Sequence, residues 1–130
     1  MHEKQHRAAP DGVATSHFTR DRESVACARS WATAVYSAAG GPVPDVCELL
    51  VSEVATNAVV HGEGPEYRIT VRDDHSIEVW DASPDEPLRR YADVEQTSGR
   101  GLELLEALAP GYTVSTELGG KSVRFTPKGW

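Results

Sequence analysis

Apolar residues recur at helical spacing in the segment 22–39. Their separations of three and four positions place them on one face of a helix. That face comprises Val25, Ala28, Ala32, Val35, Tyr36 and Ala39. A Gly-Gly-Pro sequence at 40–42 follows, and these residue types end helices. The pattern therefore predicts a first helix over 22–39.

A second helix is predicted from about Pro44 to His61. Pro44 and Asp45 suit the first turn of a helix, and Gly62 comes directly after the last predicted helical residue. The apolar stripe of this helix comprises Cys47, Leu50, Val51, Val54 and Ala58. We expect the stripe to pack against the core of the domain.

Runs with a period of two predict strands elsewhere in the chain. YRITV at 67–71 and SIEVWD at 76–81 flank a polar Asp-Asp-His turn, which predicts a hairpin. YTVST at 112–116 and SVRFT at 122–126 flank two glycines, which predicts a second hairpin. VATSHF at 13–18 can form an edge strand, although its alternation is weak.

The segment 82–99 between the two hairpins contains two prolines and little periodicity. A loop of this length in a compact domain is usually functional or disordered. A short helix follows it, with Leu102, Leu105 and Ala109 on one side, and ends at Pro110.

The predicted order is therefore strand, two helices, hairpin, loop, helix and hairpin. This order is typical of an α+β fold, a two-layer sandwich in which helices cover one face of a mixed, largely antiparallel sheet. A chain of 130 residues suits a single domain. We expect a disordered polar tail at 1–12 and one folded domain at 13–130.

Composition excludes several classes of protein. The net charge of −7, from 13 basic and 20 acidic residues, disfavours direct nucleic-acid binding, which needs a positive field. No apolar run approaches the roughly 20 residues of a membrane span, and the polar start of the chain lacks a signal peptide. A cytoplasmic location is therefore expected, where Cys27 and Cys47 would be small buried thiols rather than a disulfide.

Glu53, Asn57 and His61 follow one another at intervals of four along the second predicted helix. Residues four apart lie on one face of a helix, so the carboxylate, the amide and the imidazole project side by side. An ordinary polar face would give the same pattern, and it is the simpler explanation of these three residues alone.

Three further segments carry residues that suit one ligand. Asp81 ends a predicted strand, although an aspartate there is also an ordinary turn residue. In SGRGLELLEAL, Gly99 and Gly101 open a helix, so backbone N–H groups can face an anion. In GGKSVRF, a glycine turn delivers Lys121 and Ser122 onto a strand.

In this order, the four segments resemble the ATP-binding domain shared by histidine kinases, Hsp90-type chaperones, type II topoisomerases and MutL proteins, the GHKL superfamily. Within it, the chain is most similar to small anti-sigma factor serine/threonine kinases. The resemblance covers about residues 13–126. ELLVSEVATNAVVHG resembles the N-box, VWDASPDEP the first glycine box and GRGLELLEAL the second. The resemblance implies the Bergerat ATP-binding fold, with ATP and Mg²⁺ as cofactors.

Roles for individual residues follow from that resemblance. It implies that Asn57 holds Mg²⁺, that Glu53 is the general base and that Asp81 binds the adenine amino group. An amide oxygen is a suitable Mg²⁺ ligand, and a carboxylate within about 3 Å of a hydroxyl can accept its proton. The other residues implied to bind the cofactor are Ser83, Pro87, Gly99, Arg100, Gly101, Leu102 and Ser122.

The chain departs from the family pattern at two places. Ser83 stands where many relatives have glycine, and no glycine lies between Gly64 and Gly99, so the predicted lid at 84–98 is short of glycine. Ser122 stands where the family often has a threonine that supports the aspartate. His61 is interpreted as a helix cap, and Lys121 has no assigned role.

The resemblance predicts a kinase that phosphorylates an anti-sigma antagonist and sequesters a sigma factor, binding ATP and releasing ADP. A non-catalytic ATP-binding module that sequesters a partner is the main alternative. A histidine kinase fragment is poorly supported, because the sequence shows no upstream helical hairpin with a phosphorylatable histidine. An α+β domain that binds no nucleotide would require all four segments to resemble the family by coincidence. We expect a sigma factor or antagonist to dock on the first helix and the lid, where Arg20, Arg22 and Arg29 offer positive charge, and a homodimer is expected from the family.

Overall fold

The computed structural model describes residues 14–40, 42–82, 101–117 and 119–127. In chain order the elements are β1 (Ala14–Thr19), α1 (Ser24–Ala38), α2 (Val46–His61), β2 (Glu63–Val71), β3 (Ile77–Ala82), α4 (Gly101–Leu108), β4 (Thr113–Glu117) and β5 (Gly120–Phe125). The predicted tail at 1–12 and the predicted lid at 84–98 lie outside the described residues. The element order follows the sequence-based prediction.

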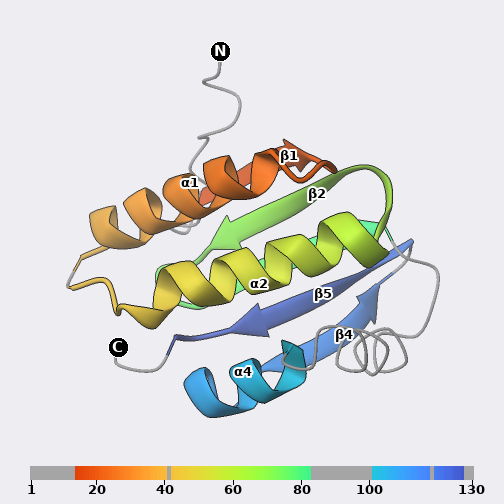
Figure 1. Cartoon of the computed structure of the whole chain (residues 1–130). Coiled ribbons are helices and arrows are strands. Elements are labelled where there is room, and N and C mark those ends of the chain that lie inside the picture. Colours follow the sequence, from red (N-terminus) through yellow and green to blue (C-terminus); the bar gives the residue numbers. More distant parts are fainter. Residues whose placement is uncertain (1–13, 41, 83–100, 118, 128–130) are drawn as a thin grey trace.

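The described strands form one sheet in the order β1-β2-β3-β5-β4. The helices lie together on one face of this sheet, with α2 running between α1 and α4 (Figure 1). This confirms the predicted α+β class and the predicted two layers. Every described strand pair is antiparallel, whereas the sequence allowed a mixed sheet.

The helix and strand bounds differ from the predicted ones at a few ends. Helix α1 begins at Ser24, because Asp21 accepts a hydrogen bond from the backbone N–H of Ser24 and stops the helix from starting earlier. Strand β2 begins at Glu63, four residues before the predicted start, with an irregular register between Glu63 and Tyr67. Gly64 has a φ of 83°, which a glycine adopts without strain and which accompanies the bulge.

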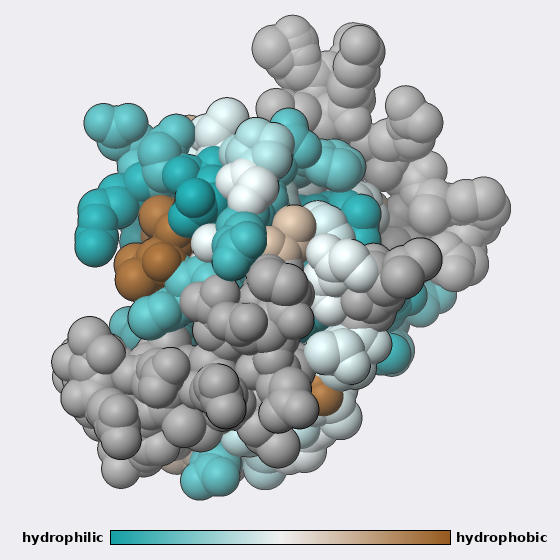
Figure 2. All heavy atoms as spheres, turned by 90° about the vertical axis from the view of Figure 1, so that its right-hand side faces the viewer, coloured by the Kyte–Doolittle hydropathy of each residue, from teal (hydrophilic) through white to brown (hydrophobic). Residues whose placement is uncertain are grey.

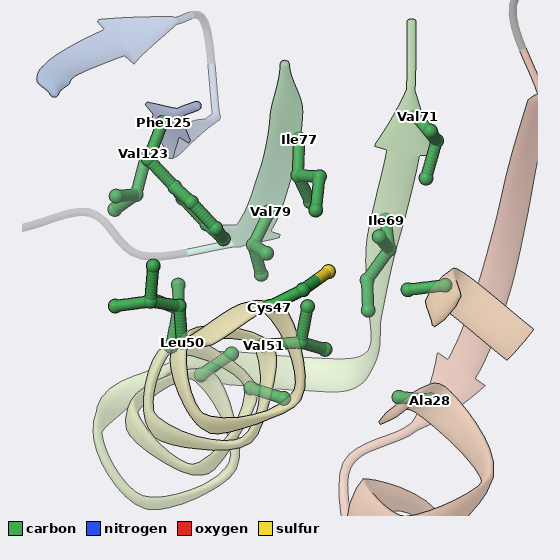
Figure 3. Packing of buried hydrophobic residues seen from close by; sticks show 14 of the residues in the cluster. Ala28, Cys47, Leu50, Val51, Ile69, Val71, Ile77, Val79, Val123 and Phe125 are labelled. Carbon is green, nitrogen blue, oxygen red and sulfur yellow. The ribbon is translucent and has the colours of Figure 1, made fainter. Parts of the chain in front are cut away.

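The core lies between the helices and the sheet. From α2, Cys47, Leu50 and Val51 point toward side chains of β2, β3 and β5, and Ala28 enters from α1 (Figure 3). All five residues of the predicted α2 stripe are buried. On α1 the burial pattern differs from the prediction: Trp31 is buried and Ala39, just past the helix, is exposed.

The two cysteines are free thiols with different environments. Cys47 is buried, as predicted. Cys27 is exposed, so that prediction was wrong for it. It precedes the buried Ala28 by one position, and successive helical residues point about 100° apart, which turns the Cys27 side chain away from the core.

The turn between β2 and β3 is fastened to the end of α1. His75 has a φ of 68°, and its Nε2 lies 3.0 Å from the carbonyl oxygen of Gly40. Its ring also meets the ring of Tyr36 edge to face, with centroids 4.9 Å apart. These contacts hold the hairpin against the helical layer. Within the described ranges, no helix has the length and apolar character needed to cross a membrane.

Candidate functional site

Asn57 is the most buried member of the polar row on α2. Only 7% of its surface is exposed, whereas Glu53 and His61 are half-buried. The other buried residues of α2 are the apolar ones that face the sheet and the neighbouring helices. An amide in such a position is costly unless it has a polar partner, so its placement is more informative than that of an exposed asparagine.

Asp81 lies near the end of β3 and is almost completely buried. Its Oδ2 is 3.1 Å from Nζ of Lys121 on β5, and the two side chains are 3% and 2% exposed. Charged side chains are rarely buried to this degree unless they are paired. The carboxylate predicted to bind adenine is therefore at a core position, next to an ammonium group that sequence analysis left without a role.

The register of β3 and β5 explains why Lys121 meets Asp81. Asp81 is directly opposite Lys121, and Trp80 is directly opposite Ser122. Opposite residues of an antiparallel pair share a face, and successive residues alternate between faces. The same face as Asp81 carries the apolar pairs Ile77–Phe125 and Val79–Val123.

Ser122 therefore lies on the sheet face of Trp80, and it is 2% exposed. The sequence predicted that Ser122 would support Asp81, but the register gives the position opposite Asp81 to Lys121. The reason is the strict alternation of side chains along a strand, since a shift of one residue changes the face. Ser122 as a cofactor-binding residue stays a prediction.

Gly62 brings the end of α2 against Asp81. A Cβ added at Gly62 would lie 3.1 Å from both Cβ and Cγ of Asp81, and it would overlap the carbonyl oxygen of Ala58. The φ of Gly62 is −76°, so the glycine serves this close approach and not an unusual backbone conformation. Sequence analysis treated Gly62 only as the residue after the helix, although a glycine directly following the Glu-Asn-His row was a signal.

The C-terminal end of α2 is also held by Arg20. The guanidinium group donates hydrogen bonds to the carbonyl oxygens of Val59, at 2.7 Å, and Gly64, at 2.8 Å. The last carbonyls of a helix lack partners within the helix, and a cation there also interacts favourably with the helix dipole. Arg20, predicted as a docking residue, thus has a structural role, whereas Arg22 is exposed and Arg29 donates to Ser52 Oγ at 3.1 Å.

Most of the second glycine box forms helix α4. This helix begins at Gly101 and lies beside α2. Its first backbone N–H groups have no partners within the helix, which suits an anion such as phosphate. Ser83, Pro87, Gly99 and Arg100 lie outside the described residues, as does the side chain of Leu102, so their predicted roles stay predictions.

Other parts of the described surface offer less chemistry. A shallow hollow of about 640 Å³ lies at β1 and the start of α1, and its lining includes His17, Phe18 and Glu66 but none of the predicted site residues. From the side where α2 ends, the described surface is mostly hydrophilic with small separate hydrophobic areas (Figure 2). Leu49 and Val60, both on α2, are the exposed large hydrophobic residues of the described ranges.

Comparison with known proteins gives one family. The model of the histidine kinase-like ATPase domain matches residues 18–126, which includes α2, β3, β5 and the segments that lead into α4. A search of curated proteins found no match. Because the family model spans most of the chain, the chain belongs to the family of histidine kinase-like ATPase domains.

Proposed function

We propose that this chain binds ATP with Mg²⁺ and acts as a serine/threonine kinase of the anti-sigma factor type. It would phosphorylate an anti-sigma antagonist and so regulate sigma-factor-dependent transcription. The observation that carries the proposal is the buried Asp81 carboxylate packed against Gly62, at the end of the helix that bears Glu53 and Asn57.

The base-binding part of the site rests on Asp81. A buried carboxylate is favourable where it meets hydrogen-bond donors, and the exocyclic amino group of adenine is such a donor. The absence of a side chain at Gly62 lets the end of α2 approach Asp81 closely, since a Cβ there would lie 3.1 Å from two side-chain atoms of Asp81. A buried carboxylate acceptor beside a residue without a side chain supports a flat, hydrogen-bonding base as the ligand.

The proposed Mg²⁺ site and general base depend on Asn57 and Glu53 in the polar row along α2. Asn57 offers an amide oxygen, which suits Mg²⁺ when phosphate oxygens and waters complete the octahedron. Bound Mg²⁺ would neutralise phosphate charge during transfer. Glu53 lies one turn before Asn57 and is half-buried, so its carboxylate can accept a proton from a hydroxyl group that arrives from solvent.

The first experiment is a calorimetric titration of the protein with ATP, with and without Mg²⁺. Asp81→Asn should remove ATP binding, and Asn57→Ala should remove the effect of Mg²⁺. Asp73→Asn is the matched control, because Asp73 is an exposed aspartate in the turn at the other end of the same hairpin. Unchanged ATP affinity in Asp81→Asn, with the fold verified by circular dichroism, would contradict the proposed site.

A second measurement separates the kinase from the non-catalytic alternative. Glu53→Gln should bind ATP as the wild type does and lose phosphoryl transfer to a cognate antagonist. ATP binding without transfer by the wild-type protein would instead identify a nucleotide-dependent binding module that sequesters its partner. Equal transfer by Glu53→Gln and the wild type would exclude Glu53 as the general base.

For the protein partner, the proposed contacts are Arg22, which is exposed just before α1, and Arg29, which is half-buried on α1. Arg22→Glu should weaken partner binding and leave ATP affinity unchanged. Arg20→Glu is the informative comparison, because it removes the two hydrogen bonds to α2 and β2 and should lower stability. Loss of ATP binding in Arg22→Glu would contradict a separate docking surface.

A further inference from the structure

A role for Asp81 in binding adenine does not by itself explain why Lys121 is buried beside it as an ion-pair partner. The Nζ–Oδ2 distance of this ion pair is 3.1 Å, and both side chains are at least 97% buried. The pair occupies the third position of a row whose two preceding members are apolar pairs. A third apolar pair would continue the core without any charge.

Stability does not account for a charged pair at this position. The cost of removing two charges from water often exceeds their attraction, and replacing a buried ion pair by apolar residues is often neutral or stabilising. Asp81 has a proposed ligand, but Lys121 would then be needed only as a counter-ion. Its Nζ lies 3.1 Å from Oδ2 of Asp81, so a ligand group that contacts this carboxylate oxygen would also lie close to the ammonium group.

We propose, on the basis of the proposed ATP site, that Lys121 is a second base-recognition residue. Asp81 accepts a hydrogen bond from the exocyclic amino group of adenine, and Lys121 donates one to the adjacent ring nitrogen N1. The two groups have the capacity for both contacts, because an ammonium has three donors and each carboxylate oxygen accepts more than one hydrogen bond. The pair thus presents an acceptor and a donor side by side.

This arrangement of acceptor and donor would distinguish adenine from guanine. Adenine carries a donor, the amino group, beside an acceptor, N1. Guanine carries the reverse, an acceptor O6 beside the donor N1–H. In a site whose ribose and phosphate positions are fixed, the Asp81–Lys121 pair matches adenine at both atoms. Sites built to hydrogen-bond a group discriminate strongly against analogues that lack it, because buried polar groups are then left unpaired.

The test compares ATP with 1-deaza-ATP, in which a C–H replaces N1 and the amino group is kept. Each is titrated by calorimetry into the wild-type protein and into Lys121→Met. Since a hydrogen bond to a charged donor is lost, 1-deaza-ATP should bind the wild type about 10- to 100-fold more weakly than ATP. Lys121→Met should bind ATP more weakly than the wild type does and should bind both nucleotides equally.

Two further variants of Lys121 serve as controls for the comparison of ATP with 1-deaza-ATP. Lys121→Arg retains a charged donor, so the difference between the two nucleotides should persist. Lys121→Thr is used if Lys121→Met does not fold, because threonine places a hydroxyl group opposite Asp81 but has neither the length nor the ammonium group of lysine. The difference between ATP and 1-deaza-ATP should disappear in this variant as well.

The outcomes separate this inference from the proposed function. If the wild type binds neither nucleotide, the proposed ATP site fails and the inference fails with it. If the wild type binds ATP and 1-deaza-ATP equally, the ATP site stands and the role of Lys121 is wrong. A wild-type difference that persists undiminished in the folded Met or Thr variant also overturns it, because another group then contacts N1.

Discussion

Gly62 is the residue through which the core and the proposed site can be tested together. Substitution with alanine adds one methyl group between the last turn of α2 and Asp81. The new Cβ would lie 3.1 Å from two side-chain atoms of Asp81 and would overlap the carbonyl oxygen of Ala58. Neither neighbour is the free end of a flexible side chain, so the backbone at the end of α2 must move.

The expected cost is the difference between overpacking of the folded state and a smaller stabilisation through the unfolded chain. Gly62 has a φ of −76°, which alanine adopts without strain. Replacing glycine at such a position would by itself stabilise the protein by about 0.4–1 kcal/mol through the unfolded chain. Overpacking a close contact costs about 1–3 kcal/mol, so we expect a net destabilisation of roughly 1–2 kcal/mol. Because Asp81 is the contacted residue, ATP affinity should fall as well.

Gly40 provides the matched control. It has a φ of 109°, and a Cβ added there would meet nothing within 4 Å. Gly40→Ala should therefore lose stability through backbone strain, by about 1 kcal/mol, and leave ATP affinity unchanged. Urea denaturation gives the two stabilities, and calorimetry gives the two affinities. Wild-type stability and ATP affinity in Gly62→Ala would refute the close approach of α2 to Asp81.

Three other predictions concern buried groups. Lys121→Met should lower the free energy of unfolding by about 3–5 kcal/mol because it removes the cationic partner of the buried Asp81 carboxylate, and Asp81→Leu combined with Lys121→Met should recover most of that loss in urea denaturation. Leu50→Ala should cost about 2–5 kcal/mol, since its side chain is fully buried, and an unchanged urea midpoint would contradict its place in the core. Burial raises the pKa of Cys47 to about 11, so the unfolded chain loses this proton first as the pH rises, and stability is lost between about pH 8.5 and 11. The loss should reach roughly 2 kcal/mol by about pH 10.5, and Cys47→Ala should show a shallower decline in urea midpoints measured across that range.

Local periodicity was sufficient to predict the elements of the fold. The α2 stripe has helical spacing, and each of its residues is buried as that spacing requires. The hairpin between β2 and β3 was visible from two alternating runs around a polar turn. The burial of Trp31 was harder to predict, because it depends on Phe18 of β1, whose ring lies 5.9 Å away. That contact depends on how the edge strand passes the helix.

Long-range pairing set the limit for predicting the site. Sequence analysis selected Asp81 and Glu53 as candidates because each stands in a recognisable local segment. It could not pair Asp81 with Lys121, since that contact requires the register between two strands that are far apart in the chain. An error of one residue in this register exchanges Lys121 for Ser122 and moves the partner to the other face. The hydrogen bonds of Arg20 were not predicted for a similar reason, because its acceptors lie on α2 and β2.

The burial of the proposed site bears on how its few polar groups would discriminate between ligands. Asp81 and Lys121 continue a face of the sheet that is otherwise apolar, and Asn57 belongs to the buried part of α2. These groups are removed from water by the fold itself, before any ligand is bound. A ligand that hydrogen-bonds these groups does not have to displace strongly bound water from them. A ligand that leaves one of the hydrogen bonds unmade incurs the full desolvation cost of the group without a partner. The core that stabilises the domain would therefore also make the proposed site selective, and variants that loosen the core near Gly62 should reduce base discrimination before they unfold the protein.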